Sequence, residues 1–161
     1  MNQTLRKCFV VLLFGTAILL SHQVHSYQQQ AAGLKTSVAI DHVALNVANL
    51  DASVSFYTGV FGFQEIPAAA KGRRWLSLGK GVALHLLGDR TEKVVDNRSV
   101  HVAFTSDDLP LIIQRLKERK IEWFDFAGST GAMSTGRTDG VRQIFLRDPD
   151  GYWIEVNDAR R

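Results

Sequence analysis

The chain has 161 residues, 45% of them hydrophobic and 22% charged, with a formal net charge of +3. This length suits one domain or two small fused units. The composition excludes collagen-like, coiled-coil and disordered chains.

The first 26 residues have the anatomy of a secretory signal peptide. Arg6 and Lys7 precede an almost wholly apolar run at 9–20, and polar residues follow at 21–26. The apolar run is too short to span a bilayer comfortably as a helix, which needs about 20 residues. We therefore expect a signal peptide at 1–26 and an exported protein, periplasmic or secreted, without a membrane partner after cleavage. An uncleaved membrane anchor is the alternative.

Cleavage would change the charge balance and the set of reactive side chains. Residues 1–26 hold two of the 19 basic residues and none of the 16 acidic ones, which leaves 17 against 16. A nearly neutral chain gives no support to a nucleic-acid partner. The single cysteine, Cys8, is also lost, so no thiol nucleophile or disulfide is expected. Three histidines remain: His42, His85 and His101.

A polar lead-in at 27–36 is followed by a first structural unit at about 37–88. Alternating apolar residues mark its strands, and Gly62 marks the end of its helix. We expect strands at 37–47, 63–67, 73–78 and 82–87, a helix from Asn49 or Asp51 to Phe61, and a tight turn at Lys80-Gly81.

The same order repeats after a charged linker at 88–98, in a second unit at about 98–158. The sequence predicts strands at 99–105, 121–126, 141–147 and 152–157, and a helix capped by Asp107 or Asp108 with Leu111, Ile112 and Leu116 facing inward. A loop is expected at 127–140 and a turn at 148–151. Two βαβββ units predict an α+β fold.

The repeat places possible ligands at matching positions. HVAL begins at His42 and HVAF begins at His101, while His85 and Glu155 each stand four residues after a glycine on the last strand of their unit. On each first strand the histidine shares its face with small or polar residues, and the bulky residues take the other face. Three imidazoles and one carboxylate suit Zn²⁺, Ni²⁺, Fe²⁺, Mn²⁺ or Co²⁺. The alternative interpretation is that single histidines are structural and that Glu155 lies on the surface.

Two runs resemble the vicinal-oxygen-chelate superfamily, which includes glyoxalase I, fosfomycin-resistance thiol transferases, bleomycin-resistance proteins and extradiol dioxygenases. They are HVALNVANLDASVSFYTGVFGF from His42 and FLRDPDGYWIEV from Phe145. The resemblance covers residues 38 to about 157. It implies that the paired modules form a cup-shaped mixed sheet around one metal ion, that the substrate is a small molecule, and that the chain is a homodimer.

The resemblance leaves the reaction open. Glyoxalase I relatives usually carry His or Gln, Glu, His and Glu at the four ligand positions, whereas the second position here is His85. We expect a glyoxalase-I-like lyase or isomerase acting on a small oxygenated substrate, with Glu155 as ligand and catalytic proton shuttle. The alternatives are an Fe(II) extradiol-type dioxygenase, which would use His42, His101 and Glu155, and a non-catalytic small-molecule binding protein.

Several other side chains are weaker candidates. Trp75 and Trp153 are expected either to line the pocket or to pack in the core. The loop at 128–140 is long enough to act as a lid or is a plain surface loop. One or two of four arginines are expected to bind an anionic substrate: Arg73, Arg74, Arg137 and Arg142.

Overall fold

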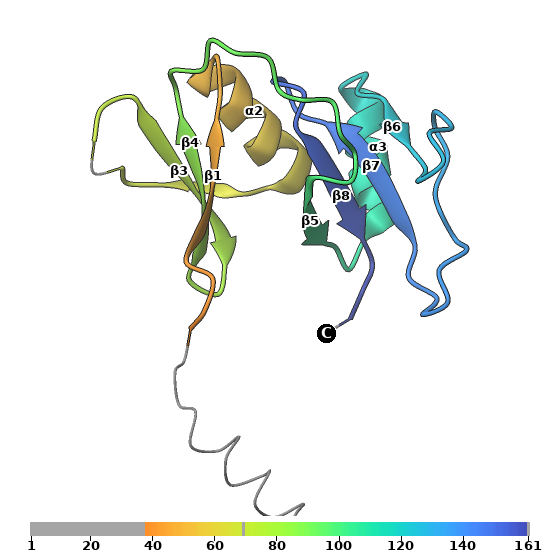
Figure 1. Cartoon of the computed structure of the whole chain (residues 1–161). Coiled ribbons are helices and arrows are strands. Elements are labelled where there is room, and N and C mark those ends of the chain that lie inside the picture. The colour runs from red at the N-terminus through yellow and green to blue at the C-terminus, as the bar shows by residue number, and fades with distance from the viewer. Residues whose placement is uncertain (1–37, 69, 161) are drawn as a thin grey trace, which may run out of the picture. The chain divides into compact units, whose positions relative to one another are not determined.

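The computed structural model describes residues 38–68 and 70–160. From Ile40 onward the chain forms one unit, which contains two copies of a βαβββ module (Figure 1). The predicted signal peptide and the predicted lead-in lie outside the described residues. Among the described residues, no helix is long and apolar enough to cross a membrane.

Module 1, at residues 42–87, follows the predicted order of one strand, one helix and three strands. Its elements are β1 (His42–Asn46), α2 (Leu50–Phe61), β2 (Gln64–Ile66), β3 (Arg73–Gly79) and β4 (Val82–Leu87). Asn49, one of the two predicted caps, begins the helix, because its side chain accepts a hydrogen bond from the Ala52 amide. Gly62 ends the helix in the left-handed region, with φ of 76°.

Module 2, at residues 101–157, repeats this order. Its elements are β5 (His101–Thr105), α3 (Leu109–Glu118), β6 (Trp123–Phe124), β7 (Gln143–Arg147) and β8 (Trp153–Asn157). Asp108 caps α3 by accepting from the Leu111 amide. The inward orientation predicted for Leu111 is wrong, since this side chain is 38% exposed. The buried face consists of Leu109, Ile112 and Leu116 at spacings of three and four, and Leu111 lies off that stripe.

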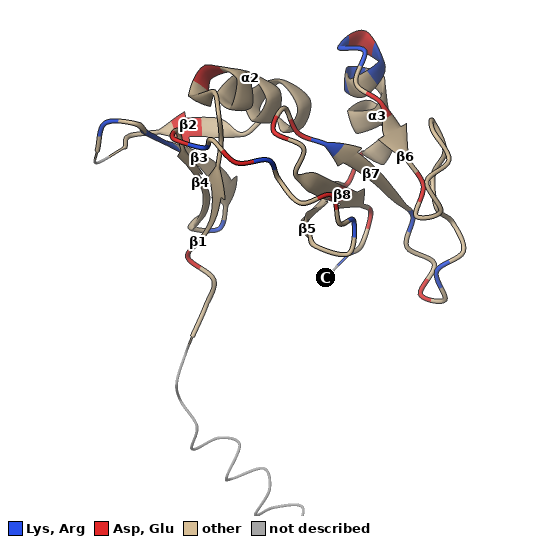
Figure 2. Cartoon of the chain, turned by 45° about the horizontal axis from the view of Figure 1, so that its top comes forward, with Lys and Arg blue, Asp and Glu red and all other residues tan. Residues whose placement is uncertain are grey.

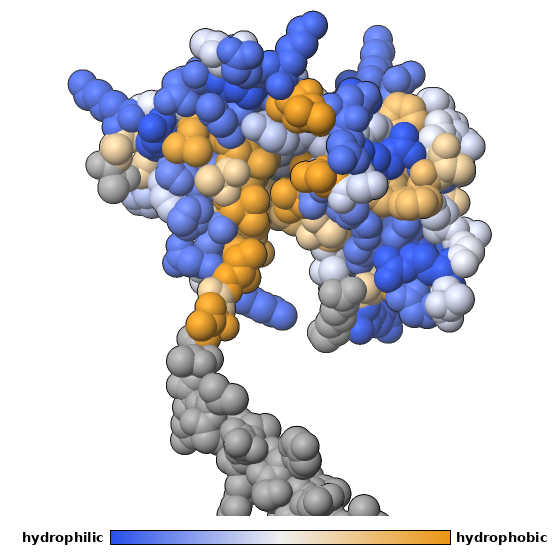
Figure 3. Space-filling view, in the orientation of Figure 1, coloured by the Kyte–Doolittle hydropathy of each residue, from blue (hydrophilic) through white to orange (hydrophobic). Residues whose placement is uncertain are grey.

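Each module forms its own mixed four-stranded sheet. The strand orders are β1-β4-β3-β2 and β5-β8-β7-β6, with the first pair parallel and the other pairs antiparallel in both sheets. The strand that carries the first histidine of each module is therefore a terminal strand, paired on one side only. Figure 3 shows hydrophobic surface running along β1 and the chain that leads into it, where Ile40 is 63% exposed.

The predicted faces of the two terminal strands are confirmed. In β1, Leu45 is buried while His42 and Ala44 are exposed, and in β5 the burial alternates in the same phase. The apolar face of each strand packs into the hydrophobic core. The opposite face, with its histidine, is left free of core packing.

The two modules are joined through aromatic packing and a buried polar contact. Phe104 of β5 packs against Phe61 and Phe63, with ring centroids 5.3 and 5.1 Å apart. The Tyr57 hydroxyl, on α2, donates to the Asp148 carboxylate at 2.9 Å, and both side chains are buried. Burial raises the pKa of the Tyr57 hydroxyl well above its usual value, and the nearby Asp148 charge adds to this effect.

The turn at 148–151 also reaches across to module 1. Asp150 accepts hydrogen bonds from the Ala48 amide and the Ser53 hydroxyl at the start of α2, at 2.8 and 3.2 Å. Arg90, on the linker between the modules, forms an ion pair with the same carboxylate. The turn predicted from sequence therefore also fixes one module against the other. Elsewhere acidic and basic residues lie mostly on loops and helix ends, where both signs are mixed (Figure 2).

Candidate metal centre

The first pair of candidate ligands lies on module 1. His42 on β1 and His85 on β4 have ring centroids 5.6 Å apart. The parallel register pairs His85 with Ala44, and Ala44 lies two residues from His42 on the same strand, so the two histidines are neighbours on one face of the sheet. Trp75 of β3 stacks on the His85 ring at 4.0 Å. The sequence predicts that Trp75 lines the pocket or packs in the core; it is only partly buried, and it packs against the two histidines of module 1.

The two histidines of module 1 differ in the partners of their ring nitrogens. His42 uses Nδ1 to contact the Asp41 carboxylate at 2.6 Å, and since a carboxylate only accepts, Nδ1 carries the proton. The Nε2 atom of His85 is buried and has no hydrogen-bond partner. Burial, the His42 ring and the Arg73 charge lower the pKa of His85, which favours the neutral ring that metals bind.

The second pair lies on module 2, where the register of β5 and β8 places Ala103 opposite Glu155. His101 Nε2 stands 3.2 Å from a carboxylate oxygen (Oε2) of Glu155. The Nδ1 atom of the same ring donates to the Arg98 carbonyl at 2.8 Å, so the neutral ring presents a lone pair at Nε2. A lone pair and a carboxylate oxygen in contact need a cation between them, and either a proton or a metal ion meets that need.

Glu155 is a buried carboxylate, with 7% of its surface exposed, so the surface interpretation of this residue is wrong. Asn157, two residues further along β8, donates from Nδ2 to Glu155 Oε1 at 2.6 Å. The backbone amide of Ala159 donates to Oδ1 of Asn157, and this second contact fixes the orientation of the Asn157 side chain. Glu155 Oε1 therefore accepts from Asn157, and Oε2 is the oxygen that faces His101 and could bind a metal.

The four side chains fit a divalent metal by their chemistry, since imidazole nitrogens and carboxylate oxygens are the donors that such ions bind. They are not brought to one point within a chain. Among residues 38–68 and 70–160, no group of three or more His, Cys, Asp or Glu side chains is placed to hold one ion. The structure therefore holds two half-sites: the module 1 half-site, with His42 and His85, and the module 2 half-site, with His101 and Glu155.

A pocket of about 530 Å³ opens beside the module 2 half-site. Phe145 forms a buried wall and Phe126, 65% exposed, stands at its edge. The polar side of the pocket carries Arg137 and Gln143, whose side chains are joined by a 2.9 Å hydrogen bond. The 127–140 segment, predicted as a loop, supplies part of this lining and forms only isolated bridges at Thr130 and Ser134.

Of the four arginines proposed as anion binders, only Arg137 lines this pocket. Arg74 pairs with Glu65 and Asp51, and Arg142 pairs with Asp158. Arg73 also pairs with a carboxylate, since its Nη1 lies 3.6 Å from Asp89 Oδ2.

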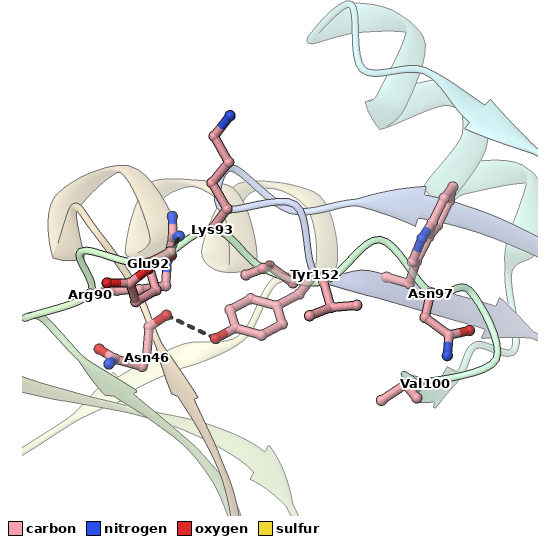
Figure 4. Close-up of a pocket in the computed structure, with 10 residues that line it drawn as sticks. Asn46, Arg90, Glu92, Lys93, Asn97, Val100 and Tyr152 are labelled. Atoms are coloured by element: carbon pink, nitrogen blue, oxygen red, sulfur yellow. Dashed lines mark hydrogen bonds between the residues drawn. The ribbon is translucent and has the colours of Figure 1, made fainter.

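A second pocket, of about 420 Å³, lies along the linker between the modules (Figure 4). Asn46, Arg90 and Tyr152 line it, and the Tyr152 hydroxyl donates to the Asn46 carbonyl at 2.9 Å. None of the four candidate ligands lines this pocket. Trp153 also lines this second pocket, with its ring centroid 4.5 Å from the Arg98 guanidinium and 4.4 Å from that of Arg147, and it does not line the pocket beside Glu155.

Sequence reasoning missed the residues that orient the candidate ligands. Asp41 precedes His42 directly, and Asn157 lies two residues from Glu155 on the same strand face. That spacing was a usable signal for Asn157, because residues i and i+2 of a strand are neighbours. Gln143 had no comparable signal, since its role depends on a contact with a loop residue.

Comparison with known proteins agrees with this fold. A family described as the Glyoxalase/Bleomycin resistance protein/Dioxygenase superfamily matches residues 39–156. The chain is 30% identical over 120 residues to metallothiol transferase FosB of Shouchella clausii, covering 73% of this chain and 78% of that protein. It is 26% identical over 126 residues to Glyoxylase I 4 of Arabidopsis thaliana, covering 73% of this chain and 69% of that protein.

Solved structures show the same fold at lower identity. Oxidase ChaP-H2 superposes with a TM-score of 0.63 at 20% identity, covering 78% of this chain and 96% of that one. Lactoylglutathione lyase from Agrobacterium tumefaciens superposes with a TM-score of 0.58 at 22% identity, covering 78% and 96%. The paired βαβββ modules define the vicinal-oxygen-chelate fold. The chain belongs to the glyoxalase/bleomycin resistance protein/dioxygenase superfamily.

Proposed function

We propose that this protein is a metal-dependent lyase or isomerase that acts on a small oxygenated molecule. His42, His85, His101 and Glu155 would hold one divalent ion, of zinc, nickel, iron, manganese or cobalt. The observation that carries the proposal is the contact between His101 Nε2 and Glu155 Oε2, where two acceptors face each other at 3.2 Å. An ion there would bind two neighbouring substrate oxygens and stabilise the negative charge that develops on them.

We further propose that each site is shared between two chains of a homodimer. The half-sites stand on β1 and β5, which are terminal strands of separate sheets. A twofold axis that sets β1 of one chain beside β5 of the other would join complementary half-sites twice. It would also cover the exposed edge of each strand, which in a soluble protein is otherwise open to unwanted pairing.

The ligand count favours a lyase or isomerase over a dioxygenase. Four protein ligands would leave fewer positions on the ion for a substrate and dioxygen together than three ligands would. Glu155 is the one carboxylate among the four ligands. It would remove a proton from the carbon beside the substrate carbonyl and return it to the neighbouring carbon. Asn157, by holding Oε1, would keep that carboxylate turned toward the substrate.

Metal analysis of the purified protein is the first test. We expect about one divalent ion per chain in the wild type and a much lower content in His85→Ala, because a ligand is lost. A binding protein without turnover remains the alternative if the wild type carries no metal and a metal chelator leaves its ligand binding unchanged. Wild-type metal content in His85→Ala would remove that residue from the site.

Mixed dimers test whether the site is shared. His42→Ala and Glu155→Ala chains, co-expressed with different tags, should together bind about one quarter of the wild-type metal, because half the dimers carry one intact site. The matched control mixes His42→Ala with His85→Ala chains, which are both altered in module 1. Every shared site then contains one altered half-site, so this mixture should bind no metal. Equal recovery in the two mixtures would contradict a shared site.

Turnover separates the candidate reactions. Isomerisation of a small oxygenated substrate, lost on chelation and restored by metal, is the expected activity. Oxygen consumption with a catechol would instead indicate the dioxygenase. Full activity of Glu155→Ala would exclude its role in proton transfer.

Export is a separate proposal that rests on the sequence of residues 1–26. Expression of the whole chain in a bacterial host should give a periplasmic protein that lacks this segment. Mass measurement of the mature chain checks the cleavage. A full-length product in the membrane fraction would support the uncleaved anchor.

A further inference from the structure

Arg98 lies in the linker turn, defined as residues 97–100, which leads into β5 and to His101 (Figure 1). A hydrogen bond from the Val100 amide to the Asn97 carbonyl, at 3.0 Å, closes this turn. The Arg98 carbonyl accepts from His101 Nδ1 at 2.8 Å. Since a carbonyl only accepts, this contact places a ring proton on Nδ1 and sets the direction of Nε2. The position of the linker turn therefore governs the orientation of a candidate metal ligand.

The side chain of Arg98 ties the linker turn to module 2. Its Nη1 donates to the carbonyls of Asp125 and Phe126, at 3.2 and 2.8 Å, in the short segment between β6 and the loop at 127–140. Val100, in the linker turn, is 72% exposed, so packing of the turn residues does little to hold the turn in place. The guanidinium of Arg98 is therefore an anchor for a turn that is otherwise largely exposed.

The same guanidinium lies against Trp153 of β8, with its Cζ atom 4.5 Å from the ring centroid. Trp153 is paired with His101 in the register of β5 and β8, and Glu155 follows two residues later on the same face. Asp96, also on the linker, accepts from Trp153 Nε1 at 2.9 Å and holds the ring in place. Arg98 thus contacts a residue that is a neighbour of both candidate ligands in the module 2 half-site.

The surroundings of Arg98 suit a guanidinium better than other side chains. Its Cζ atom also lies 5.9 and 6.0 Å from the ring centroids of Phe124 and Phe145. A planar cation can lie against a ring and donate in its own plane at the same time, which the point charge of a lysine does less well. The Nε atom is buried and has no hydrogen-bond partner among residues 38–68 and 70–160. Burying that donor costs free energy, so the carbonyl and ring contacts must outweigh the cost.

We propose that Arg98 is a positioning residue of the module 2 half-site. Its side chain anchors the linker turn, so that its own carbonyl holds His101 with a proton on Nδ1 and with Nε2 turned toward Glu155. Arg98 acts through His101 and is not itself a ligand. This rests on the metal-dependent function proposed above, and it adds a residue that prepares the half-site before an ion is bound.

The Nδ1 proton of His101 tests the proposal in the absence of metal. Isotope-labelled, metal-free wild type should give a protected NMR signal from this proton, because its hydrogen bond to the Arg98 carbonyl slows exchange with water. The signal is assigned by its loss in His101→Gln. In Arg98→Met, which removes the donors and the charge, exchange should be about tenfold faster. A wild-type exchange rate in folded Arg98→Met would overturn the proposal.

Arg147→Met is the matched control. The Arg147 guanidinium lies 4.4 Å from the same Trp153 ring, but its ion-pair partner is Asp96 and it is not part of the linker turn. This variant should keep the protected signal, and an equal loss would mean that any cation beside Trp153 serves. Arg98→Lys keeps a donor and should restore part of the protection. If Arg98→Met does not fold, Arg98→Lys decides, and a wild-type rate there would overturn the proposal.

Metal binding separates failure of this proposal from failure of the metal site. Arg98→Met should weaken zinc binding by about tenfold and change the cobalt absorption spectrum, whereas Arg147→Met should stay near wild type in both. If zinc binds equally well to wild type and folded Arg98→Met, the positioning role is wrong and the metal centre stands. If wild type binds no zinc, the proposed function is wrong, and the exchange of the Nδ1 proton still decides whether Arg98 positions His101.

Discussion

The module 1 half-site and the module 2 half-site occupy equivalent strands but differ in chemistry. Module 1 contributes two imidazoles, packed against Trp75, with the buried Nε2 of His85 free of partners. Module 2 contributes an imidazole and a buried carboxylate whose second oxygen is held by Asn157. The candidate ligands occupy matching positions in the two modules, but only module 2 has a carboxylate among them. Under the proposed function, module 1 would chiefly bind metal, whereas module 2 would also supply the proton acceptor and the pocket.

The largest expected effect comes from removing the one charged ligand. Glu155→Gln keeps the size of the side chain but loses its charge, and should weaken zinc binding by more than about a hundredfold, beyond the usual cost of losing an outer-shell contact. His85→Ala, in the neutral half-site, should cost less. Competition with a chelating dye measures both. A greater loss for His85→Ala would reverse the assignment of roles to the modules.

Glu65→Gln serves as the control for charge. Glu65 is a carboxylate of β2 that pairs with Arg74, away from either half-site. Zinc affinity should not change in this variant. A loss similar to that of Glu155→Gln would mean that overall charge, and not coordination, governs binding.

The next effect concerns the contact that holds the modules together. Asp150→Ala should lower the free energy of unfolding by about 2 kcal/mol, because it leaves Arg90 and the Ala48 amide without their partner. Urea denaturation measures the change. Asp139→Ala removes an exposed carboxylate, also paired with an arginine, and should have a much smaller effect. Equal losses would show that Asp150 does not join the modules.

The order of the elements could be predicted from the sequence because it depends on local patterns, whereas the four candidate ligands stay a prediction. Alternation gave the faces of β1 and β5, and the repeat singled out His85 and Glu155. The error at Leu111 arose because the exact start of α3 decides which apolar residues share its buried stripe. The repeat also contained no information on whether the ligands meet within a chain.

That separation of the half-sites depends on tertiary contacts with no local signature. Phe104 packs on Phe61 and Phe63, and Asp150 contacts the start of α2, over separations of about 40 to 100 residues. Each contact joins residues that would also suit an ordinary core or turn. Gln143 and Arg137 illustrate the same limit, since only the path of the loop brings them together.

Residues that hold the candidate ligands in place, without being ligands themselves, offer a smaller test of the difference between the half-sites. Asn157→Ala should weaken zinc binding by about tenfold, because Glu155 Oε1 loses its donor inside a buried site. Asp41→Asn should have a weaker effect, because Asp41 is 85% exposed and water can replace it beside His42. Cobalt absorption spectra should change for Asn157→Ala and stay near wild type for Asp41→Asn. A larger change for Asp41→Asn would place the more sensitive half-site in module 1.

The smallest effect tests whether the modules unfold together. Tyr57→Phe removes the hydrogen bond to Asp148 and should cost about 1 kcal/mol near neutral pH. Because burial raises the pKa of Tyr57 in the folded state, its contribution is complete below about pH 10, the unfolded value, and is lost as pH rises through the folded value. Wild type should therefore lose stability more steeply than Tyr57→Phe in alkaline urea titrations. Parallel curves would mean that Tyr57 does not couple proton release to unfolding. Two separate transitions in either protein would show that the modules, alike in fold and different in chemistry, are also independent in stability.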